Sequence, residues 1–362
     1  MNTRYKYVIR FIKEHNLQGI IFNDYLSGMY LLEIYRSVNP GEIRLNLLVT
    51  ENSVVLITDK LSLRRIEREI PPWVQVVIGD GDKFMRSGKG CFREVRREIQ
   101  KQSIRKIGVF KELSCEFVPA HVKLIMLKEN PLAKLAEIKT EYEVEMLKKA
   151  NAISDKVYAQ IANELQTNVS EIRLKARIDE LLFAFGSDHN QGGALVSFGE
   201  NTNAIHAVST NRKLKKGDLV MLDFAAYVKG IGSDITRTFV IGKANHNQKK
   251  MWHTVYHAQK KALNAIRPKI SGKAIDQVAR DYIKAAGYGD YFFHTLGHQL
   301  GLMRGNTKLY CGENKPLYPG MALTVEPGIY TENGGVRIED DILVTKDGMI
   351  NLTNSSKEME LG

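Results

Sequence analysis

The sequence predicts a two-domain protein in which an α+β C-terminal domain follows a smaller α/β domain with a mixed sheet. The chain has 362 residues, enough for two hydrophobic cores. Short β-prone runs alternate with helical patterns in the first third, whereas long helical patterns and Gly-punctuated hairpins make up the remainder. Pro131 disfavours helix continuation from Asn130, so we expect the domains to be residues 1–130 and 131–362.

Composition and charge narrow the class of protein. The chain is 43% hydrophobic and 26% charged, as ordinary soluble proteins are, and no apolar run reaches the roughly 18 residues of a membrane span. The N-terminus begins a mixed polar helix instead of a signal peptide, and three scattered cysteines argue against a disulfide framework. We therefore expect a cytoplasmic protein with no membrane partner.

The net charge of +11 raises the question of nucleic-acid binding. The densest basic segment, residues 92–101, has apolar residues at 92, 95 and 99, which is helical spacing. Its basic side chains would then form the solvated face of an amphipathic helix. A nucleic-acid partner is not expected.

The N-terminal part contains alternating helical and strand patterns. Tyr5, Val8, Ile9 and Ile12 recur at helical spacing, which predicts a helix ending near Asn16. Strands are expected at 19–22, 73–78 and 106–110, a hairpin at 45–58, and helices at about 60–70 and 91–102. Nothing here has the residue types and spacing of a catalytic site.

The C-terminal part begins with a helix signal. Thr140 and Glu143 form a capping-box pattern ahead of a long helical segment, 144–164. Further helices are expected at 170–185, 248–266 and 272–286, the last closed by Gly287 in left-handed geometry. Hairpins between them carry the candidate functional residues.

The first of these hairpins spans residues 221–238. Two apolar runs flank a break at Lys229-Gly230. If the turn is centred near Val228-Lys229, Asp223 and Asp234 fall opposite each other on one face, with Cβ atoms roughly 5 Å apart. Taken alone, two such acids would simply point into solvent, but a close pair on a buried face needs a cation.

Three further candidates lie downstream, in β-rich, Gly-punctuated settings: His298, Glu326 and Glu339. Each alone has a structural interpretation, as a core histidine, a turn cap and part of an exposed acidic run. Together with the two aspartates they supply four carboxylates and one imidazole, a hard ligand set that suits Mn²⁺, Fe²⁺, Co²⁺ or Zn²⁺. Carboxylates can also bridge two ions about 3.5–4 Å apart.

This ordered series with its flanks resembles the metallopeptidases of the pita-bread fold, which include Xaa-Pro aminopeptidases, prolidases and methionine aminopeptidases. The match extends over about residues 138–352. The resemblance implies a pair of divalent ions, Mn²⁺ foremost, and Glu326 as proton acceptor from the attacking water. It assigns Asp223 to one ion, Asp234 and Glu339 as bridging ligands, and His298 and Glu326 to the other ion.

Other positions match the substrate side of the same family. The resemblance implies that His206 and His294 contact substrate and act in catalysis, and that Tyr330 and Arg337 lie near the metal centre. Arg337 would orient a ligating carboxylate. A creatinase- or prolidase-like N-terminal domain of this length implies a role in shaping the substrate pocket and in forming a homodimer.

One family position is different. Relatives carry a histidine seven residues after the metal histidine, where this chain has Gly305. Loss of one charge-stabilising donor costs about 10² to 10³ in rate. The expected function is hydrolysis of Xaa-Pro peptide bonds. The alternatives are a lyase or an amide or amidine hydrolase of the same fold, or a non-catalytic binding protein.

Overall fold

The computed structural model describes residues 2–36, 43–79, 91–110, 117–188 and 193–362. The chain divides into two compact units, Met1–Ala136 and Glu137–Gly362. The expected boundary at 130–131 lies ahead of α6 (Pro131–Ala136), which packs against helices of the first unit. Of the three cysteines, Cys91 and Cys311 are free, and Cys115 lies outside the described residues.

In the described residues, the first unit is built on a six-stranded sheet in the order β4-β3-β2-β1-β5-β6. Strand β1 is antiparallel to β2 and parallel to β5, so the predicted mixed sheet is confirmed. The strands are β1 (Gly19–Phe22), β2 (Leu45–Thr50), β3 (Val54–Thr58), β4 (Gln75–Ile78), β5 (Lys106–Val109) and β6 (Lys123–Met126), and the helices before α6 are α1 (Thr3–Glu14), α2 (Tyr25–Leu32), α3 (Lys60–Ile66) and α5 (Phe92–Lys101).

Besides α6, the helix α2 and the strand β6 of this unit were not predicted. Helix α2 is buried from Ser27 to Leu32, and a helix that is apolar on every side has no amphipathic period to detect. Strand β6 has four residues, mostly exposed, at the edge of the sheet. The basic helix α5 is confirmed, with Val95 and Ile99 buried.

The four long helices of the second unit match the predicted segments: α7 (Glu141–Glu164), α8 (Glu171–Ala184), α9 (His246–Ala265) and α10 (Gly272–Ala285). Thr140 and Glu143 form the expected capping box, in which each side chain accepts a hydrogen bond from the other residue's backbone N–H. Gly287, with φ +89°, ends the α10 region in left-handed geometry.

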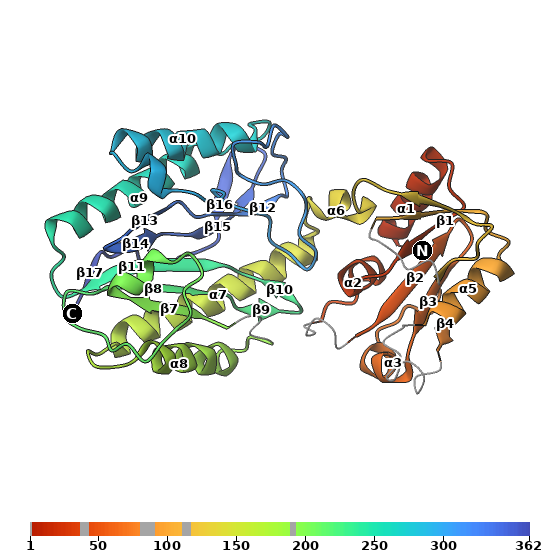
Figure 1. The fold of residues 1–362 in the computed structure, drawn as a ribbon, viewed down its shortest axis with the longest axis horizontal. Coiled ribbons are helices and arrows are strands. Elements are labelled where there is room, and N and C mark those ends of the chain that lie inside the picture. The colour runs from red at the N-terminus through yellow and green to blue at the C-terminus, as the bar shows by residue number, and fades with distance from the viewer. Residues whose placement is uncertain (1, 37–42, 80–90, 111–116, 189–192) are drawn as a thin grey trace. The chain divides into compact units, whose positions relative to one another are not determined.

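Curved, mainly antiparallel strands lie between two pairs of helices in this unit, with α7 and α8 on one side and α9 and α10 on the other (Figure 1). The described strands form sheets ordered β17-β11-β8-β7, β12-β15-β16, β13-β14 and β10-β9. Their bounds are β7 (Leu195–Phe198), β8 (Leu219–Phe224), β9 (Tyr227–Val228), β10 (Ile231–Gly232), β11 (Ile235–Ile241), β12 (Ala322–Val325), β13 (Gly328–Thr331), β14 (Gly334–Arg337), β15 (Asp340–Val344), β16 (Met349–Asn351) and β17 (Glu360–Leu361).

The register of the β8–β11 hairpin corrects one prediction. The turn is Lys229-Gly230, both with positive φ (54° and 76°), as a two-residue hairpin turn requires. Asp223 therefore pairs with Thr236, and Asp234 precedes β11, two residues away. A shift of two positions keeps Asp234 on the same face as Asp223, so the two acids are diagonal neighbours and not a directly opposed pair.

Of the helices in the described residues, none combines the length and apolar character needed to cross a bilayer.

Candidate metal centre and substrate side

The two aspartates lie at the end of β8 and just before β11. Asp223 Oδ2 accepts a hydrogen bond from Arg337 Nη2 at 2.5 Å. The Asp234 backbone N–H donates to Asp341 Oδ2 at 2.9 Å, which fixes the start of β11. Both Asp223 and Asp234 are partly buried, and their charges interact.

His298 is oriented by its neighbours. Its backbone N–H donates to Thr324 Oγ1, and its Nδ1 lies 3.2 Å from the Gln299 carbonyl oxygen. A carbonyl can only accept, so Nδ1 carries the proton and the Nε2 lone pair is free. Nε2 faces Asp234 Oδ2 at 3.7 Å and Glu326 Oε1 at 3.6 Å. This is the tautomer that a metal ligand requires.

The two glutamates come from segments held together by backbone contacts. Glu326 follows β12, where its backbone N–H donates to Leu296 and its Oε1 accepts from Thr324 Oγ1. Glu339 forms an isolated bridge with Thr236, whose hydroxyl also donates to Glu339 Oε2 at 2.7 Å. Gln259 of α9 donates to the carbonyls of Val325 and Ile338, the residues before each glutamate, and so sets their spacing.

The electrostatics of these carboxylates indicate a cation site. Burial and the charge of Asp223 raise the pKa of Asp234 to about 7, and burial with Asp234 raises that of Glu326 to about 8. The pKa of Glu339 is raised well above its usual range by burial and by the other acids. These groups repel one another, and the positive charges of Arg304 and Arg337 lower their pKa values without offsetting the repulsion.

The donor atoms fit a divalent ion. One ligand atom each from Asp234, His298 and Glu339 lies within 4.8 Å of the others. Glu326 adjoins this group through its contact with His298, and Asp223 through its charge interactions with Asp234, Glu326 and Glu339. Carboxylate oxygens with one imidazole nitrogen suit Mn²⁺, Fe²⁺, Co²⁺ or Zn²⁺. Burial lowers the pKa of His298 to about 4, so the imidazole is neutral and able to coordinate.

The predicted substrate-side residues form a connected chain next to this centre. Arg337 Nη1 donates to the Tyr330 hydroxyl at 2.7 Å, and that hydroxyl lies 3.0 Å from His294 Nε2. His294 Nδ1 lies 2.8 Å from the Thr295 carbonyl, so Nδ1 carries the proton and Nε2 accepts from Tyr330. Burial lowers the pKa of His294 to about 4, and the exposed His206 is close enough to add to that effect.

Several supporting residues were missed by sequence reasoning. Thr236 donates to Glu339 and accepts from Arg337 Nε at 3.0 Å, so one hydroxyl joins two site residues. Its place two residues after Asp234, on the same face of the strand, was the available signal. Gln259 gave no signal, because a glutamine in an amphipathic helix is usually solvated.

The acidic run after Arg337 excludes the structural alternative for Glu339. Glu339, Asp340 and Asp341 are all buried, with at most 2% exposure, so the interpretation of an exposed run is wrong. Asp340 pairs with Arg237 at 2.9 Å, whereas Asp341 accepts from Asn151 and from the Asp234 backbone. Of the three, Glu339 interacts with Asp234, Glu326 and Asp223, and Asp341 interacts with Asp234.

Gly305 lies in a crowded position. A Cβ there would be 2.6 Å from both Gln299 Oε1 and Glu137 Cγ. The preceding residue, Arg304, is exposed, and its positive charge acts on Asp234 and His298. The segment thus places a cation beside the centre without a side chain at 305.

Comparison with known proteins identifies the family of the chain. Residues 145–346 match the model of metallopeptidase family M24. A Pyrococcus horikoshii Xaa-Pro dipeptidase is 29% identical over 361 residues, 99% of each chain, and one from Pyrococcus furiosus is 35% identical over 252 residues, 69% of this chain and 71% of the relative. The solved structure of a Bacillus anthracis Xaa-Pro dipeptidase superimposes with a TM-score of 0.87 at 29% identity, covering 99% of both chains.

These matches confirm the pita-bread architecture with a smaller N-terminal α/β unit. They also confirm that the protein is a metal-dependent hydrolase. The non-catalytic alternative is thereby set aside. The chain belongs to metallopeptidase family M24.

Proposed function

We propose that this chain hydrolyses the bond before proline in short peptides, as an Xaa-Pro dipeptidase or aminopeptidase, with two divalent ions. The ligands are Asp223, Asp234, His298, Glu326 and Glu339, and Mn²⁺ is the first choice of metal. One observation carries the proposal: buried carboxylates crowd together until their pKa values rise, next to a neutral imidazole with a free Nε2. The names of the relatives support the substrate class.

Divalent ions bound there would keep the carboxylates ionised, lower the pKa of a water and polarise the scissile carbonyl. Glu326 then takes the proton of the attacking water. Its carboxylate is suited to this because Thr324 holds Oε1 in place and the same oxygen faces the His298 imidazole across the site. The same group returns the proton to the leaving nitrogen.

The substrate side is assigned to His206, His294, Tyr330 and Arg337. Neutral His294 adds no charge, and its Nε2 is held by Tyr330, so the ring presents a fixed edge to the peptide. Arg337 orients the Asp223 carboxylate and holds Tyr330 at the same time. His206, exposed beside His294, is placed to contact the substrate.

Arg304 takes over part of the role of the histidine that Gly305 replaces. It is an exposed cation whose charge reaches Asp234 and His298. A positive group there stabilises negative charge that develops on the substrate carbonyl oxygen. It also favours substrates that carry a carboxylate nearby.

Metal content and a peptide panel test the proposal together. The purified chain is stripped with a chelator and reloaded separately with Mn²⁺, Co²⁺, Fe²⁺ or Zn²⁺, and bound metal per chain is measured by elemental analysis. We expect two ions per chain and turnover of Xaa-Pro dipeptides or Xaa-Pro-Yaa tripeptides, with matched Xaa-Ala peptides left intact. If the chain binds two ions but cleaves no proline peptide, the function is instead that of a non-peptidase hydrolase or a lyase. Failure to bind metal would overturn the metal site itself.

Assembly as a homodimer and a cytoplasmic location remain predictions, which size-exclusion chromatography with light scattering and cell fractionation test.

A further inference from the structure

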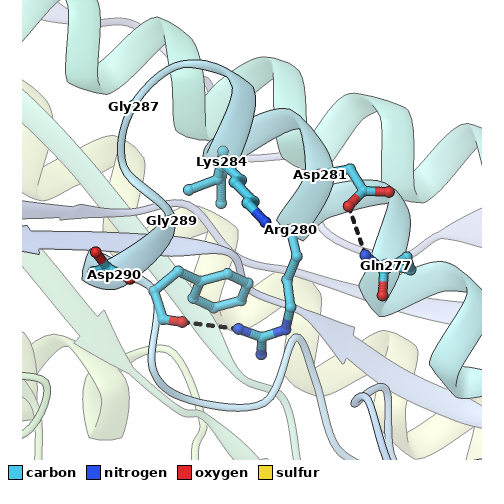
Figure 2. Close-up of a pocket in the computed structure, with 9 residues that line it drawn as sticks. Gln277, Arg280, Asp281, Lys284, Gly287, Gly289 and Asp290 are labelled. Atoms are coloured by element: carbon cyan, nitrogen blue, oxygen red, sulfur yellow. Dashed lines mark hydrogen bonds between the residues drawn. The ribbon is translucent and has the colours of Figure 1, made fainter.

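Arg280 of α10 connects that helix to the loop that carries His294. Its Nε donates to Asp276 Oδ2 at 2.6 Å, its Nη1 to the Phe292 carbonyl at 2.8 Å and its Nη2 to the His294 carbonyl at 2.5 Å. Figure 2 shows the Arg280 side chain extending from α10, with a dashed line at one of these hydrogen bonds. All three guanidinium nitrogens are therefore occupied.

The guanidinium is held rigidly. Asp276 is fully buried, and its other oxygen, Oδ1, has no hydrogen-bond partner among the described residues. Arg280 is its counter-charge, and the guanidinium carbon also lies 4.2 Å from the centre of the Phe292 ring. A planar fork with a stacked face cannot be reproduced by lysine.

The same loop sets the orientation of His294. The ring of Phe292, whose backbone Arg280 holds, meets the imidazole edge-on at 5.0 Å between centroids. The imidazole in turn accepts from Tyr330, which Arg337 holds. The guanidinium is thus linked to the imidazole both through the His294 backbone and through the Phe292 ring.

We propose that Arg280 is a positioning residue that holds the His294 imidazole in line with Tyr330 and the substrate. The inference deepens the proposed function and rests on it for the role of His294. Arg280 acts through the loop and does not touch substrate.

A cavity of about 490 Å³ lies beside Arg280 and provides a specific test. It is lined by residues that include Gln277, Arg280, Asp281, Lys284, Asp290 and Phe292 (Figure 2). If Arg280 is truncated, a small guanidinium compound has access through this cavity to the vacated position.

Arg280→Ala, Arg280→Lys and the control Lys284→Ala are compared in the metal-loaded chain. Lys284 lines the same cavity from the next turn of α10, and we expect Lys284→Ala to match wild type. Arg280→Ala is expected to lower kcat about 10- to 100-fold with bound metal unchanged, as is usual for groups that orient active-site side chains. Arg280→Lys keeps the charge beside Asp276 but not the fork, so it should fold and still lose kcat.

Methylguanidinium should restore several-fold activity to Arg280→Ala, whereas methylammonium should not. A loss of kcat without such rescue would mean that Arg280 only stabilises the fold, and the inference would be wrong.

An independent readout is the NMR spectrum of ¹⁵N-histidine-labelled, Zn²⁺-loaded protein. The His294 ring signals should change in both Arg280 variants and not in Lys284→Ala. If they stay unchanged, the positioning role is overturned even when activity falls. If they change while wild type cleaves no Xaa-Pro peptide, the positioning role stands and the proposed function is overturned.

Discussion

One buried acid of the N-terminal unit and a group of acids in the C-terminal unit have opposite surroundings. In the N-terminal unit, Asp59 caps α3: its Oδ1 accepts from the Ser62 backbone at 2.8 Å and its Oδ2 from the Ser62 hydroxyl at 3.0 Å. In the C-terminal unit, Asp234, Glu326 and Glu339 mainly face other acids. An acid whose donors come from its own helix start is structural. Acids that gather other acids, with too little positive charge to balance them, mark a cation site.

Neutralising one acid of each kind is the strongest test of this distinction between a capping acid and the acids of a cation site. Asp234→Asn should lower metal-dependent turnover by about 10³-fold or more, or about 4 kcal/mol, because a ligand is lost. In the metal-free protein the same change should raise Tm at pH 8, since it removes repulsion. Asp59→Ala should instead lower stability by about 1 kcal/mol and leave metal content unchanged. A metal-free Asp234→Asn protein less stable than wild type would contradict the account of crowded acids.

The pH dependence of stability in the metal-free chain tests the same crowding of acids. The folded-state pKa values of Asp234 (about 7) and Glu326 (about 8) lie above their unfolded values, so the folded state binds more protons, and its stability falls as pH rises through these values. His294 and His298, with pKa lowered to about 4, act in the opposite direction only below about pH 6.5. The metal-free chain should therefore lose Tm between about pH 6.5 and 8.

Mn²⁺ at about 100 times its Kd should stabilise the chain by about 2.7 kcal/mol, a rise in Tm of about 5 to 10 °C. At one fixed Mn²⁺ concentration the gain should be greater at pH 8 than at pH 6.5, because protonated carboxylates bind the ion less tightly. Hydrogen exchange by mass spectrometry should show added protection in residues 137–362 and not in 1–136. Equal added protection in both units would contradict the prediction that the metal binds in the C-terminal unit.

Gly305 tests whether the missing imidazole limits activity. Gly305→His and Gly305→Ala introduce the same Cβ, and Gln299 and Glu137 must move to make room for it. The free energy of unfolding of both variants should therefore fall by about 1–3 kcal/mol. Their difference isolates the imidazole from the steric cost. A Gly305→His protein that is no faster than Gly305→Ala on Xaa-Pro peptides would show that this position does not limit hydrolysis.

The smallest expected effect is at Arg304. Because the side chain is exposed, solvent screens its charge, and Arg304→Met should lower kcat/KM by only a few-fold, about 1 kcal/mol or less. The loss should be larger for Glu-Pro than for Leu-Pro peptides and should shrink at high salt. An equal loss on both peptides would exclude a role in selecting acidic substrates.

Local pattern was sufficient to predict most helices, the mixed N-terminal sheet and the hairpin that carries Asp223. Caps, glycines and apolar periodicity act within a few residues, so Thr140, Glu143 and Gly287 could be assigned from sequence alone. It could not predict α2, because a helix buried on all sides lacks a polar face.

The sequence by itself determined which side chains are available as ligands and in what order they occur. Only the tertiary structure decided the hairpin register and the fates of three consecutive acids: Glu339 faces Asp234, Asp340 pairs with Arg237, and Asp341 accepts from Asn151 and the Asp234 backbone. Each contact depends on which strand or helix packs against the segment around β15. The partners lie roughly 100 to 190 residues away along the chain. A local pattern carries no information at that distance.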